Sequence, residues 1–353
     1  MTDVERRIVG PPTMRDVAAL AGVSPMTVSR ALHEHPGVST AVRDRVLSAV
    51  GALGYRRNEV ARRLRQGRST GLVGVVVTNL GNPFYAGLTL GIESVLGGQG
   101  IRVLLTNTAE DEGREREVVE DLLARQIDGL VVVPAGADHR HLTDGALGGV
   151  PVVMAARPPS GIQADCVLVD DFGGARAATS ALLADGHRRI AFLGNPPAVY
   201  TGAERYRGYA VALKEAGLPV EPGLVRRRQQ TIGEAQTAAT ALLRRGVPPT
   251  AIFTANSRNT IGSLRAVARA GANVAIAGFD DFETADVLVV PLTVVAYDAE
   301  EIGREAARLL LDRMAAGAQD DVPPARRVVI DTTIIRYRRD DLIGDRNGVR
   351  VPR

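Results

Sequence analysis

The stretch Thr13–Leu32, TMRDVAALAGVSPMTVSRAL, contains two short helical patterns separated by a turn at Gly22. Thr13 is expected to cap the first helix, because its hydroxyl can accept a hydrogen bond from an unpaired N–H at a helix start. Ser24 and Pro25 mark the start of the second helix, since serine is a strong cap and proline needs no N–H at the first helical position. Two short helices joined by a tight turn predict a helix-turn-helix, whose second helix enters the DNA major groove.

Charge is distributed unevenly along the chain. Residues 1–70 contain twelve arginines and six acidic residues, a balance of +6, whereas the whole chain carries +3, so the other 283 residues balance at −3. A plain helical hairpin is the alternative interpretation of the opening stretch. The charge distribution argues against it, because an ordinary solvated charge run would divide charge less unevenly between the two parts of the chain. A basic head on a mildly acidic body favours nucleic-acid binding, because phosphate neutralisation supplies most sequence-independent affinity.

A third helix is expected between the cap Ser39 and the terminating Gly54, with Val42, Val46 and Val50 at helical spacing as core residues. The head as a whole resembles that of the LacI-type (lactose and galactose repressor) family of bacterial transcription regulators. The matching residues, in family order, are Thr13–Leu32, Gly37-Val38-Ser39, Leu53-Gly54-Tyr55, Asn58 and Ala61-Arg62-Arg63-Leu64.

The resemblance implies which side chains meet DNA. Pro25 and Met26 match the exposed specificity positions of the recognition helix, and Thr27, Ser29 and Arg30 match its phosphate- and base-contacting face. Arginine can present two donors to guanine, whereas methionine offers only apolar contact, for example to a thymine methyl. The other residues expected at the DNA are Thr13, Ser24, Asn58, Ala61, Arg62 and Leu64.

The segment from Asn58 to Gln66 matches the family's hinge helix, which folds on DNA and enters the minor groove. Leu64 occupies the position of a leucine that wedges open a base step, and such wedges kink the duplex. Family members usually carry proline just before the asparagine, whereas this chain has Arg57, which weakens the predicted helix start.

From Thr70 to about Asp340, short apolar runs alternate with helix-length segments. Buried parallel strands alternating with helices predict an α/β domain with doubly wound parallel sheets. The strands expected are Leu72–Val77, Ile101–Leu105, Gly129–Val133, Val150–Met154, Arg189–Leu193, Thr250–Thr254 and Val274–Phe279. The overall expectation is an all-α helix-turn-helix head (residues 1–56), a hinge and linker (57–70), a two-lobed effector-binding and dimerisation domain like the periplasmic binding proteins (71–340), and a polar tail (341–353).

The resemblance extends into this second part through looser motifs, including Asn82-Pro83-Phe84-Tyr85, Arg205-Tyr206-Arg207-Gly208-Tyr209 and Gly278-Phe279-Asp280. In that family the chain crosses between the lobes three times. Crossings are therefore expected near Asp170, Tyr297 and Val328. A three-stranded connection lets the lobes open and close around a ligand.

Ligands of open α/β sheets bind outside the carboxyl ends of the strands, so the interlobe cleft is the expected site. The candidate effector-binding residues are Phe84, Tyr85, Arg205, Asn256 and Asp280. The resemblance identifies Arg205 as the family's effector-binding arginine and Asp280 as an acceptor for ligand hydroxyls. Structural alternatives stay open: Phe84 packing a lobe edge, Asp280 capping a turn and Asn256 capping the next helix.

Two departures from the family concern this pocket. Its usual Asn-Asp pair is Asn256-Ser257 here, and the acidic residue that often follows the fourth strand is absent from Ala155-Ala156-Arg157. With two acceptors fewer, the pocket is less clearly built for a polyhydroxyl sugar. The effector is expected to be a sugar, a nucleoside or a small acid, and a vestigial pocket in a constitutive regulator is the alternative.

No enzymatic or metal-binding pattern stands out. The sequence contains the pattern of a serine-hydrolase elbow at Gly67-Arg68-Ser69-Thr70-Gly71. That motif lies between a strand and a helix, whereas here the pattern follows a predicted helix and precedes a predicted strand. His33-His35 and His139-His141 lack partners at zinc-ligand spacing. A dehydrogenase or kinase would need a cofactor fingerprint, which is absent. No catalytic residue, metal or cofactor is expected.

The single cysteine, Cys166, suits the cytoplasm, and neither a signal peptide nor a membrane span is apparent. A periplasmic solute-binding protein, the nearest rival, would carry an export signal in place of a basic helix-turn-helix. A palindromic operator requires two heads related by a two-fold axis, so a homodimer on double-stranded DNA is expected. The polar tail has no leucine heptads, which disfavours a tetramer.

Overall fold

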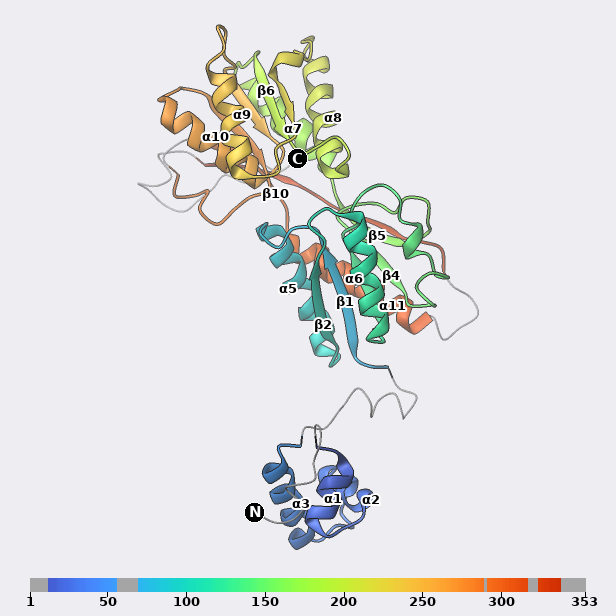
Figure 1. The fold of residues 1–353 in the computed structure, drawn as a ribbon. Helices are drawn as coiled ribbons and strands as arrows, with labels where there is room; N and C mark the ends of the chain where they lie inside the picture. Colours follow the sequence, from blue (N-terminus) through green and yellow to red (C-terminus); the bar gives the residue numbers. More distant parts are fainter. Residues whose placement is uncertain (1–11, 56–68, 289–290, 317–322, 338–353) are drawn as a thin grey trace. The chain divides into compact units, whose positions relative to one another are not determined.

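The computed structural model describes residues 12–55, 69–288, 291–316 and 323–337. The chain divides into two compact units, residues 1–70 and residues 71–353 (Figure 1). The expected hinge residues Asn58, Ala61, Arg62 and Leu64, together with Arg57, lie outside the described residues. The expected polar tail does so as well.

The described head consists of α1 (Met14–Ala21), α2 (Pro25–Leu32) and α3 (Thr40–Leu53). Thr13 and Asp16 form a reciprocal capping box at the start of α1, and Gly22 ends this helix in the left-handed region with φ 65°. Ser24 caps α2 by accepting from the N–H of Thr27. The helix-turn-helix prediction is confirmed. Its small core consists of Val17, Ala18, Ala21, Val28, Ala31, Val46 and Ala49.

The third helix starts and ends where the sequence predicts, between Ser39 and Gly54, but one detail differs. Ser39 occupies the N-cap position with extended backbone, yet its side chain makes no capping hydrogen bond. Gly54 ends the helix with φ 61°, a conformation that glycine adopts without strain. Of the three valines expected in the core, Val46 is fully buried and Val42 and Val50 are partly buried.

The second unit contains two six-stranded sheets, each the centre of a lobe. The N-lobe sheet has the order β11-β5-β4-β3-β1-β2 and is entirely parallel. Its strands are β1 (Leu72–Val77), β2 (Arg102–Asn107), β3 (Gly129–Val132), β4 (Val152–Ala155), β5 (Asp165–Val169) and β11 (Arg327–Ile330). The two-lobed α/β prediction is confirmed.

The C-lobe sheet has the order β12-β10-β9-β8-β6-β7, and only the β10–β12 pair is antiparallel. Its strands are β6 (Ile190–Gly194), β7 (Val225–Arg227), β8 (Ala251–Thr254), β9 (Ala275–Phe279), β10 (Leu292–Ala296) and β12 (Thr333–Tyr337). The sequence analysis missed five strands, namely β5, β7, β10, β11 and β12. Three of them are short, exposed or charged segments without the apolar signature of a strand covered on both faces.

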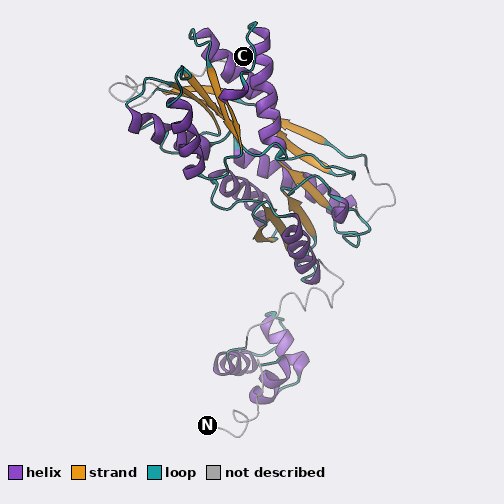
Figure 2. Cartoon of the chain, turned by 45° about the horizontal axis from the view of Figure 1, so that its top comes forward, coloured by secondary structure: helices purple, strands orange, loops and turns teal. Residues whose placement is uncertain are grey.

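Helices cover both faces of each sheet (Figure 2). In the N-lobe these are α5 (Pro83–Gly98), α6 (Glu112–Ala124) and α11 (Ala299–Ala316), and in the C-lobe α7 (Asp171–Ala184), α8 (Tyr200–Glu215), α9 (Ile232–Leu243) and α10 (Ser257–Ala270). Two short 3₁₀ helices, η1 (Arg140–Leu142) and η2 (Pro222–Leu224), lie in connections.

Helices α5 and α11 approach each other closely in the N-lobe. A methyl group built on Gly91 would lie 2.0 Å from the carbonyl oxygen of Glu300, and one on Gly303 would lie 2.1 Å from that of Leu88. Glycine at both positions therefore allows the two backbones to touch. This contact fixes α11, which follows a crossing between the lobes, against α5.

The chain crosses between the lobes three times. The first crossing follows β5 at Asp170, and the second joins β10 to α11 at Tyr297. The third lies after Ile330, at the step from β11 to β12. Val328, near which this crossing was expected, lies within β11 and pairs with β5, shortly before the crossing. The crossing is later because β11 continues the N-lobe sheet for a full strand.

None of the described helices is both long and apolar enough to cross a membrane.

Candidate functional site

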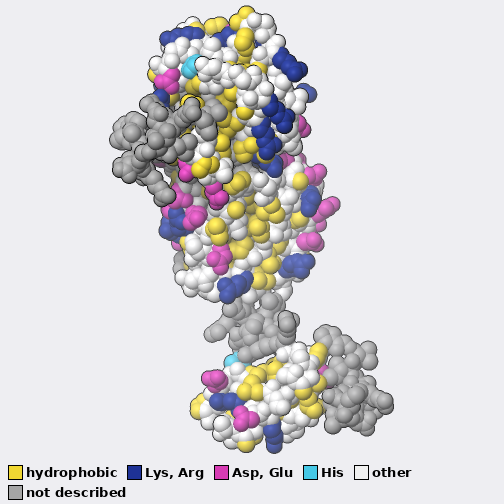
Figure 3. Space-filling view, turned by 90° about the vertical axis from the view of Figure 1, so that its left-hand side faces the viewer, with side chains coloured by type: hydrophobic (Ala, Val, Ile, Leu, Met, Phe, Trp, Pro, Cys, Tyr) yellow, Lys and Arg dark blue, Asp and Glu magenta, His cyan; other side chains and the backbone are white. Residues whose placement is uncertain are grey.

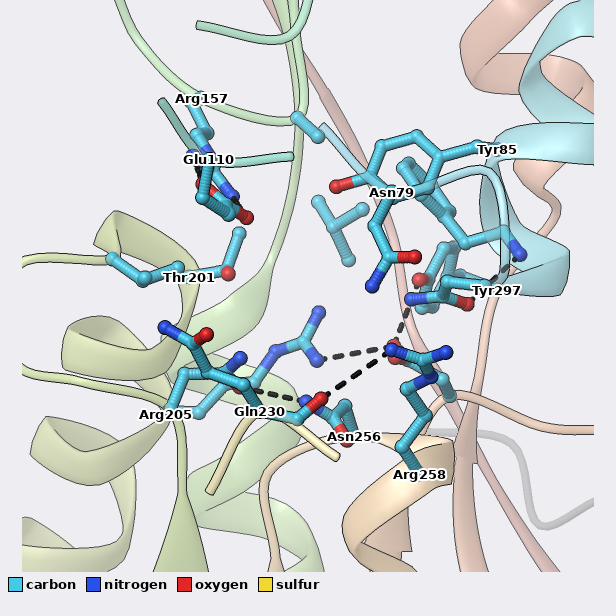
Figure 4. Close-up of a pocket in the computed structure, with 17 residues that line it drawn as sticks. Asn79, Tyr85, Glu110, Arg157, Thr201, Arg205, Gln230, Asn256, Arg258 and Tyr297 are labelled. Atoms are coloured by element: carbon cyan, nitrogen blue, oxygen red, sulfur yellow. Dashed lines mark hydrogen bonds and ion pairs between the residues drawn. The ribbon is translucent and has the colours of Figure 1, made fainter. Parts of the chain in front are cut away.

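A pocket lies where the carboxyl ends of parallel strands from both lobes face each other. It is lined by 17 residues (Figure 4). All five candidates from the sequence, Phe84, Tyr85, Arg205, Asn256 and Asp280, are among them. The rule that ligands of open sheets bind at the carboxyl ends of the strands therefore predicted which residues, far apart in the chain, lie together in the pocket.

Arg205 lies in the second turn of α8 and is buried in a dense polar network. Its Nε donates to Oδ1 of Asp171 at 2.7 Å, and Nη1 donates to the carbonyl of Ala255 at 2.6 Å. The same Nη1 lies 3.1 Å from Oδ1 of Asp280, and the guanidinium carbon lies 3.7 Å above the ring of Phe279. Much of the donor capacity of Arg205 is thus used by the protein, and its role toward a ligand stays a prediction.

Asp280 follows β9 with φ 68°, which is unusual for a residue with a side chain and is typical of strained functional positions. Its Oδ1 accepts from the hydroxyl of Tyr297 at 2.8 Å as well as facing Arg205. Burial raises the pKa of Tyr297 well above its ordinary value, and nearby Asp280 raises it further. The Asp280 carboxylate is therefore an acceptor held between a pocket arginine and a crossing segment.

Asn256 both caps a helix and lines the pocket. Its Oδ1 accepts from the N–H of Asn259 at 2.9 Å at the start of α10, and its Nδ2 donates to Oδ1 of Asn195 at 2.7 Å. The capping alternative raised by the sequence is thus correct as local structure. Asn195, which the sequence analysis did not single out, also lines the pocket.

The two aromatic candidates, Phe84 and Tyr85, line the pocket with their rings more than with polar groups. The Tyr85 hydroxyl is 2.6 Å from the hydroxyl of Thr78 inside the N-lobe, and burial raises the Tyr85 pKa. Phe84 contacts Tyr85 and Tyr297 edge to face, with ring centroids 5.0 Å and 6.0 Å away. Both rings therefore form an apolar wall at the start of α5 and leave polar contacts to other side chains.

Sequence reasoning missed an ion pair on the N-lobe side of the pocket. Arg157 donates from Nη1 and Nη2 to the two carboxylate oxygens of Glu110, at 2.7 Å and 2.6 Å, and also to the carbonyl of Pro134. Glu110 and Ala156 both have positive φ, 65° and 60°. In the run Ala155-Ala156-Arg157 the sequence analysis considered only the missing acid, although an arginine just beyond the end of β4 at Ala155 was itself a signal.

Asp171 is the second carboxylate bound to Arg205. Burial raises its pKa to about 6, although the Arg205 guanidinium acts in the opposite direction. Its Oδ2 is buried without a hydrogen-bond partner among the described residues. The folded protein therefore holds the ionised Asp171 carboxylate at a free-energy cost.

This raised pKa predicts a pH-dependent stability difference. Because the folded-state pKa lies above the ordinary value of 3.8, the contribution of Asp171 is largest at low pH and is lost as pH rises through about 6. Relative to Asp171→Asn, the parent is expected to lose about 1 kcal/mol of unfolding free energy between about pH 5 and about pH 7. Urea unfolding of both proteins at each pH measures this, and a difference that stays constant would contradict the assignment.

The head presents the exposed side of α2. Val28 and Ala31 of this helix are buried, whereas Pro25, Met26 and Arg30 are exposed, Met26 with 65% of its surface. Met26 and Arg30 are thus accessible on α2, and their role as base-reading residues stays a prediction.

Some of the hydroxyl groups expected to contact DNA form hydrogen bonds within the head. The hydroxyls of Ser24 and Thr27 lie 2.9 Å apart, and the Thr13 hydroxyl donates to Asp16 at 2.6 Å. Ser29 is partly buried. DNA contacts by these residues stay predictions.

Comparison with known proteins follows the same division into head and body. A family model for bacterial regulatory proteins of the lacI family matches residues 13–58. A second model, for periplasmic binding proteins and the sugar-binding domain of the LacI family, matches residues 70–339. The chain belongs to the LacI family. It is a transcriptional regulator with a helix-turn-helix DNA-binding domain, as the resemblance implied.

Relatives match along most of their length. The HTH-type transcriptional regulator CelR of Thermobifida fusca is 35% identical over 338 residues, covering 92% of this chain and 97% of the relative. Catabolite control protein A of Priestia megaterium is 33% identical over 307 residues, covering 86% and 92%. A solved complex of the regulator CelR with cellobiose superimposes with a TM-score of 0.67 at 32% identity, covering 92% of this chain and 98% of that one. The lac repressor dimer bound to operator and the anti-inducer ONPF shares the fold, with a TM-score of 0.73 at 24% identity, covering 94% and 99%.

Proposed function

We propose that this protein is a repressor that binds a palindromic operator as a dimer and is switched by a small molecule in the pocket between its lobes. One observation carries the proposal: the pocket network is bonded directly to the segments that connect the lobes. Arg205 binds Asp171, the residue after the first crossing, and Asp280 accepts from Tyr297, which lies in the second crossing. A ligand that binds Arg205 or Asp280 therefore acts directly on the segments that connect the two lobes.

The switch follows from differential affinity. A ligand that prefers one arrangement of the lobes shifts the protein toward it by the free energy of that preference and no more. In a dimer, the lobe arrangement sets the spacing of the two hinge segments, and this spacing decides whether both heads fit the operator. The cellobiose complex of the regulator CelR supports a small-molecule ligand for this fold. We also propose that the protein has no catalytic activity and acts in the cytoplasm, where the operator is accessible.

The N-lobe offers a face for the dimer. Leu80, Leu90 and Leu105 are large apolar side chains exposed on the loop before α5, on α5 and on the edge strand β2. Figure 3 views the side of the molecule that carries these elements and shows hydrophobic side chains gathered there. Contiguous exposed apolar surface on a monomer is typical of protein–protein interfaces. We propose that the two subunits pair through this α5–β2 face.

Leu90→Glu is expected to weaken dimerisation at least tenfold, because it places a charge in the apolar centre of the α5–β2 face. Leu90 is 59% exposed in one subunit, so the substitution costs little in the monomer fold. Val247→Glu is the matched control, since Val247 is 66% exposed in the C-lobe, away from the proposed face. Sedimentation velocity over a concentration series measures both variants. Equal dimer affinities for parent and Leu90→Glu would place the interface elsewhere.

The function is tested by selecting genomic binding sites with the purified protein, then titrating the selected operator with and without candidate ligands at one fixed salt concentration. We expect a palindromic site, dimer-dependent binding, and a change in operator affinity with a ligand that also raises the thermal unfolding temperature. Operator binding that responds to no ligand would instead support a constitutive regulator with a vestigial pocket, the alternative that the residues Ala156 and Ser257 raised. Absence of sequence-selective binding would overturn the proposal.

A further inference from the structure

One charged side chain of the pocket stands apart from the others. Arg258 is the second residue of α10, lines the pocket and is partly exposed. It forms no ion pair with any other described residue, and its one hydrogen bond there is a long one, from Nη1 to the carbonyl of Gln230 at 3.4 Å. The other two pocket arginines, Arg157 and Arg205, are each bound to carboxylates.

The acidic groups of the pocket are already engaged. Both oxygens of Glu110 accept from Arg157, and Oδ1 of Asp280 faces Arg205 and accepts from Tyr297. Figure 4 shows the Arg157–Glu110 pair on one side of the pocket and Arg258 on the other. The positive charge of Arg258 is thus left without an anionic partner inside a cleft, where a partner is worth more than in bulk water.

The backbone adds positive potential to the same pocket. Helices α5, α8 and α10 all begin at its wall, with Phe84, Thr201 and Arg258 each in a first helical turn. The starts of α5 and α10 are capped by asparagine side chains, whereas α8 has no side-chain cap. Helix starts carry partial positive charge and favour anions.

Arg258 also reaches across the cleft. A methyl group built on Gly81, in the N-lobe loop before α5, would lie 2.9 Å from Nη2 of Arg258. The guanidinium therefore lies against the N-lobe although it is carried by the C-lobe. A group bound to this guanidinium would lie near both lobes and would favour the arrangement that brings them together.

We propose that the ligand is anionic: a small polyhydroxylated molecule whose carboxylate or phosphate group pairs with Arg258. Its hydroxyls bind the acceptors and donors of Asp280, Asn195 and Asn256 on the C-lobe wall. An arginine fork binds either anion through two parallel hydrogen bonds, which accounts for an unpaired guanidinium at this position. The inference rests on the proposed function, because it assigns the chemical class of the ligand for that same pocket.

Calorimetry on the full-length protein without DNA tests the inference. The probes are inorganic phosphate, against chloride at equal ionic strength, and matched sets of pentoses and hexoses with their sugar acids and sugar phosphates. Anionic members are expected to bind at least tenfold more tightly than their neutral parents. Arg258→Gln is expected to weaken anion binding at least tenfold and to weaken neutral-sugar binding by a much smaller factor. Arg265→Gln, an exposed arginine of the same helix, is the matched control and keeps the anion preference.

The sugar acids and sugar phosphates separate the two possible anions. Neutral sugars that bind as tightly as their anionic counterparts, anion affinities equal in Arg258→Gln and the parent, or a panel in which no anion binds, would each overturn the inference. Operator titrations with the same compounds keep the two proposals apart. Release of operator by neutral sugars alone leaves the repressor function standing, whereas anion binding without selective operator binding removes the function and retains the anion site.

Discussion

Arg205→Met is expected to destabilise the protein by about 3–5 kcal/mol, because it leaves two carboxylates, Asp171 and Asp280, buried without their cation. Methionine keeps much of the apolar stem of the side chain but supplies no donor, and it lacks the guanidinium that lies over the ring of Phe279. Since the buried Asp171 carboxyl then resists ionisation, the loss is expected to grow as pH rises. Any variant molecules that fold should also lose the ligand response, because the link from the pocket to the first crossing is broken.

Urea unfolding at about pH 5 and about pH 8 measures this loss. Arg207→Met is the matched control, two residues away, since Arg207, which also lies over the ring of Phe172, is 55% exposed and pairs with Glu204 on the helix surface. Such exposed pairs contribute about 0–1 kcal/mol. Adding Asp171→Asn to Arg205→Met is expected to restore part of the lost stability, because one uncompensated charge is removed. Equal stabilities of the Arg205 and Arg207 variants would show that the buried network is not held by charge pairing.

Arg30→Ala is expected to cost about 1–3 kcal/mol in operator binding and to relax base choice in each half-site. Arg30 is exposed on α2, so its removal leaves the core of the head intact, including the buried Val28 and Ala31. The expected loss is confined to the cognate sequence, because a base contact discriminates and a phosphate contact does not.

Arg45→Ala removes the same charge from an exposed position on α3 and is the matched control. It is expected to weaken cognate and scrambled DNA by similar factors. Band shifts on both DNAs, at one salt concentration, separate the two effects. If Arg30→Ala lowered the affinity for both DNAs equally, Arg30 would be a phosphate contact and the base reader would have to be sought among the other exposed residues of α2.

Local signals in the sequence predicted the head with little error. The caps at Thr13 and Ser24 and the left-handed glycines at Gly22 and Gly54 fix helix ends through interactions within a few residues. The seven strands expected from apolar runs were predicted within about two residues, whereas the buried strands β5 and β10 were missed. Strands such as β11 and β12, with exposed and charged residues, owe their structure to pairing with distant strands, which no local pattern reports.

The pocket was predicted in location but not in its bonding. Strand ends pointed to Phe84, Tyr85, Arg205, Asn256 and Asp280, and all five line it. Which groups are free inside it depends on contacts between residues far apart in the chain. The Tyr85 hydroxyl turns to Thr78, Asn256 caps its own helix, and Arg157 finds Glu110 across a gap of 47 residues. Only the folded structure shows that Arg258, alone of the three pocket arginines, pairs with no carboxylate of the described residues.

Helix α5 serves three surfaces at once. Its first turn supplies Phe84 and Tyr85 to the pocket wall, its outer side carries Leu90 to the proposed dimer face, and Gly91 touches the backbone of α11. A shift of α5 is therefore expected to alter the pocket wall, the proposed dimer face and the contact with α11 at the same time. At the start of α10, Arg258 lines the pocket and makes a long hydrogen bond to a backbone carbonyl, so fewer contacts constrain a change at this position. When gene duplicates of this regulator diverge toward new ligands, the α5 wall is expected to stay fixed while positions such as Arg258 change, so that new specificities arise on one side of the cleft.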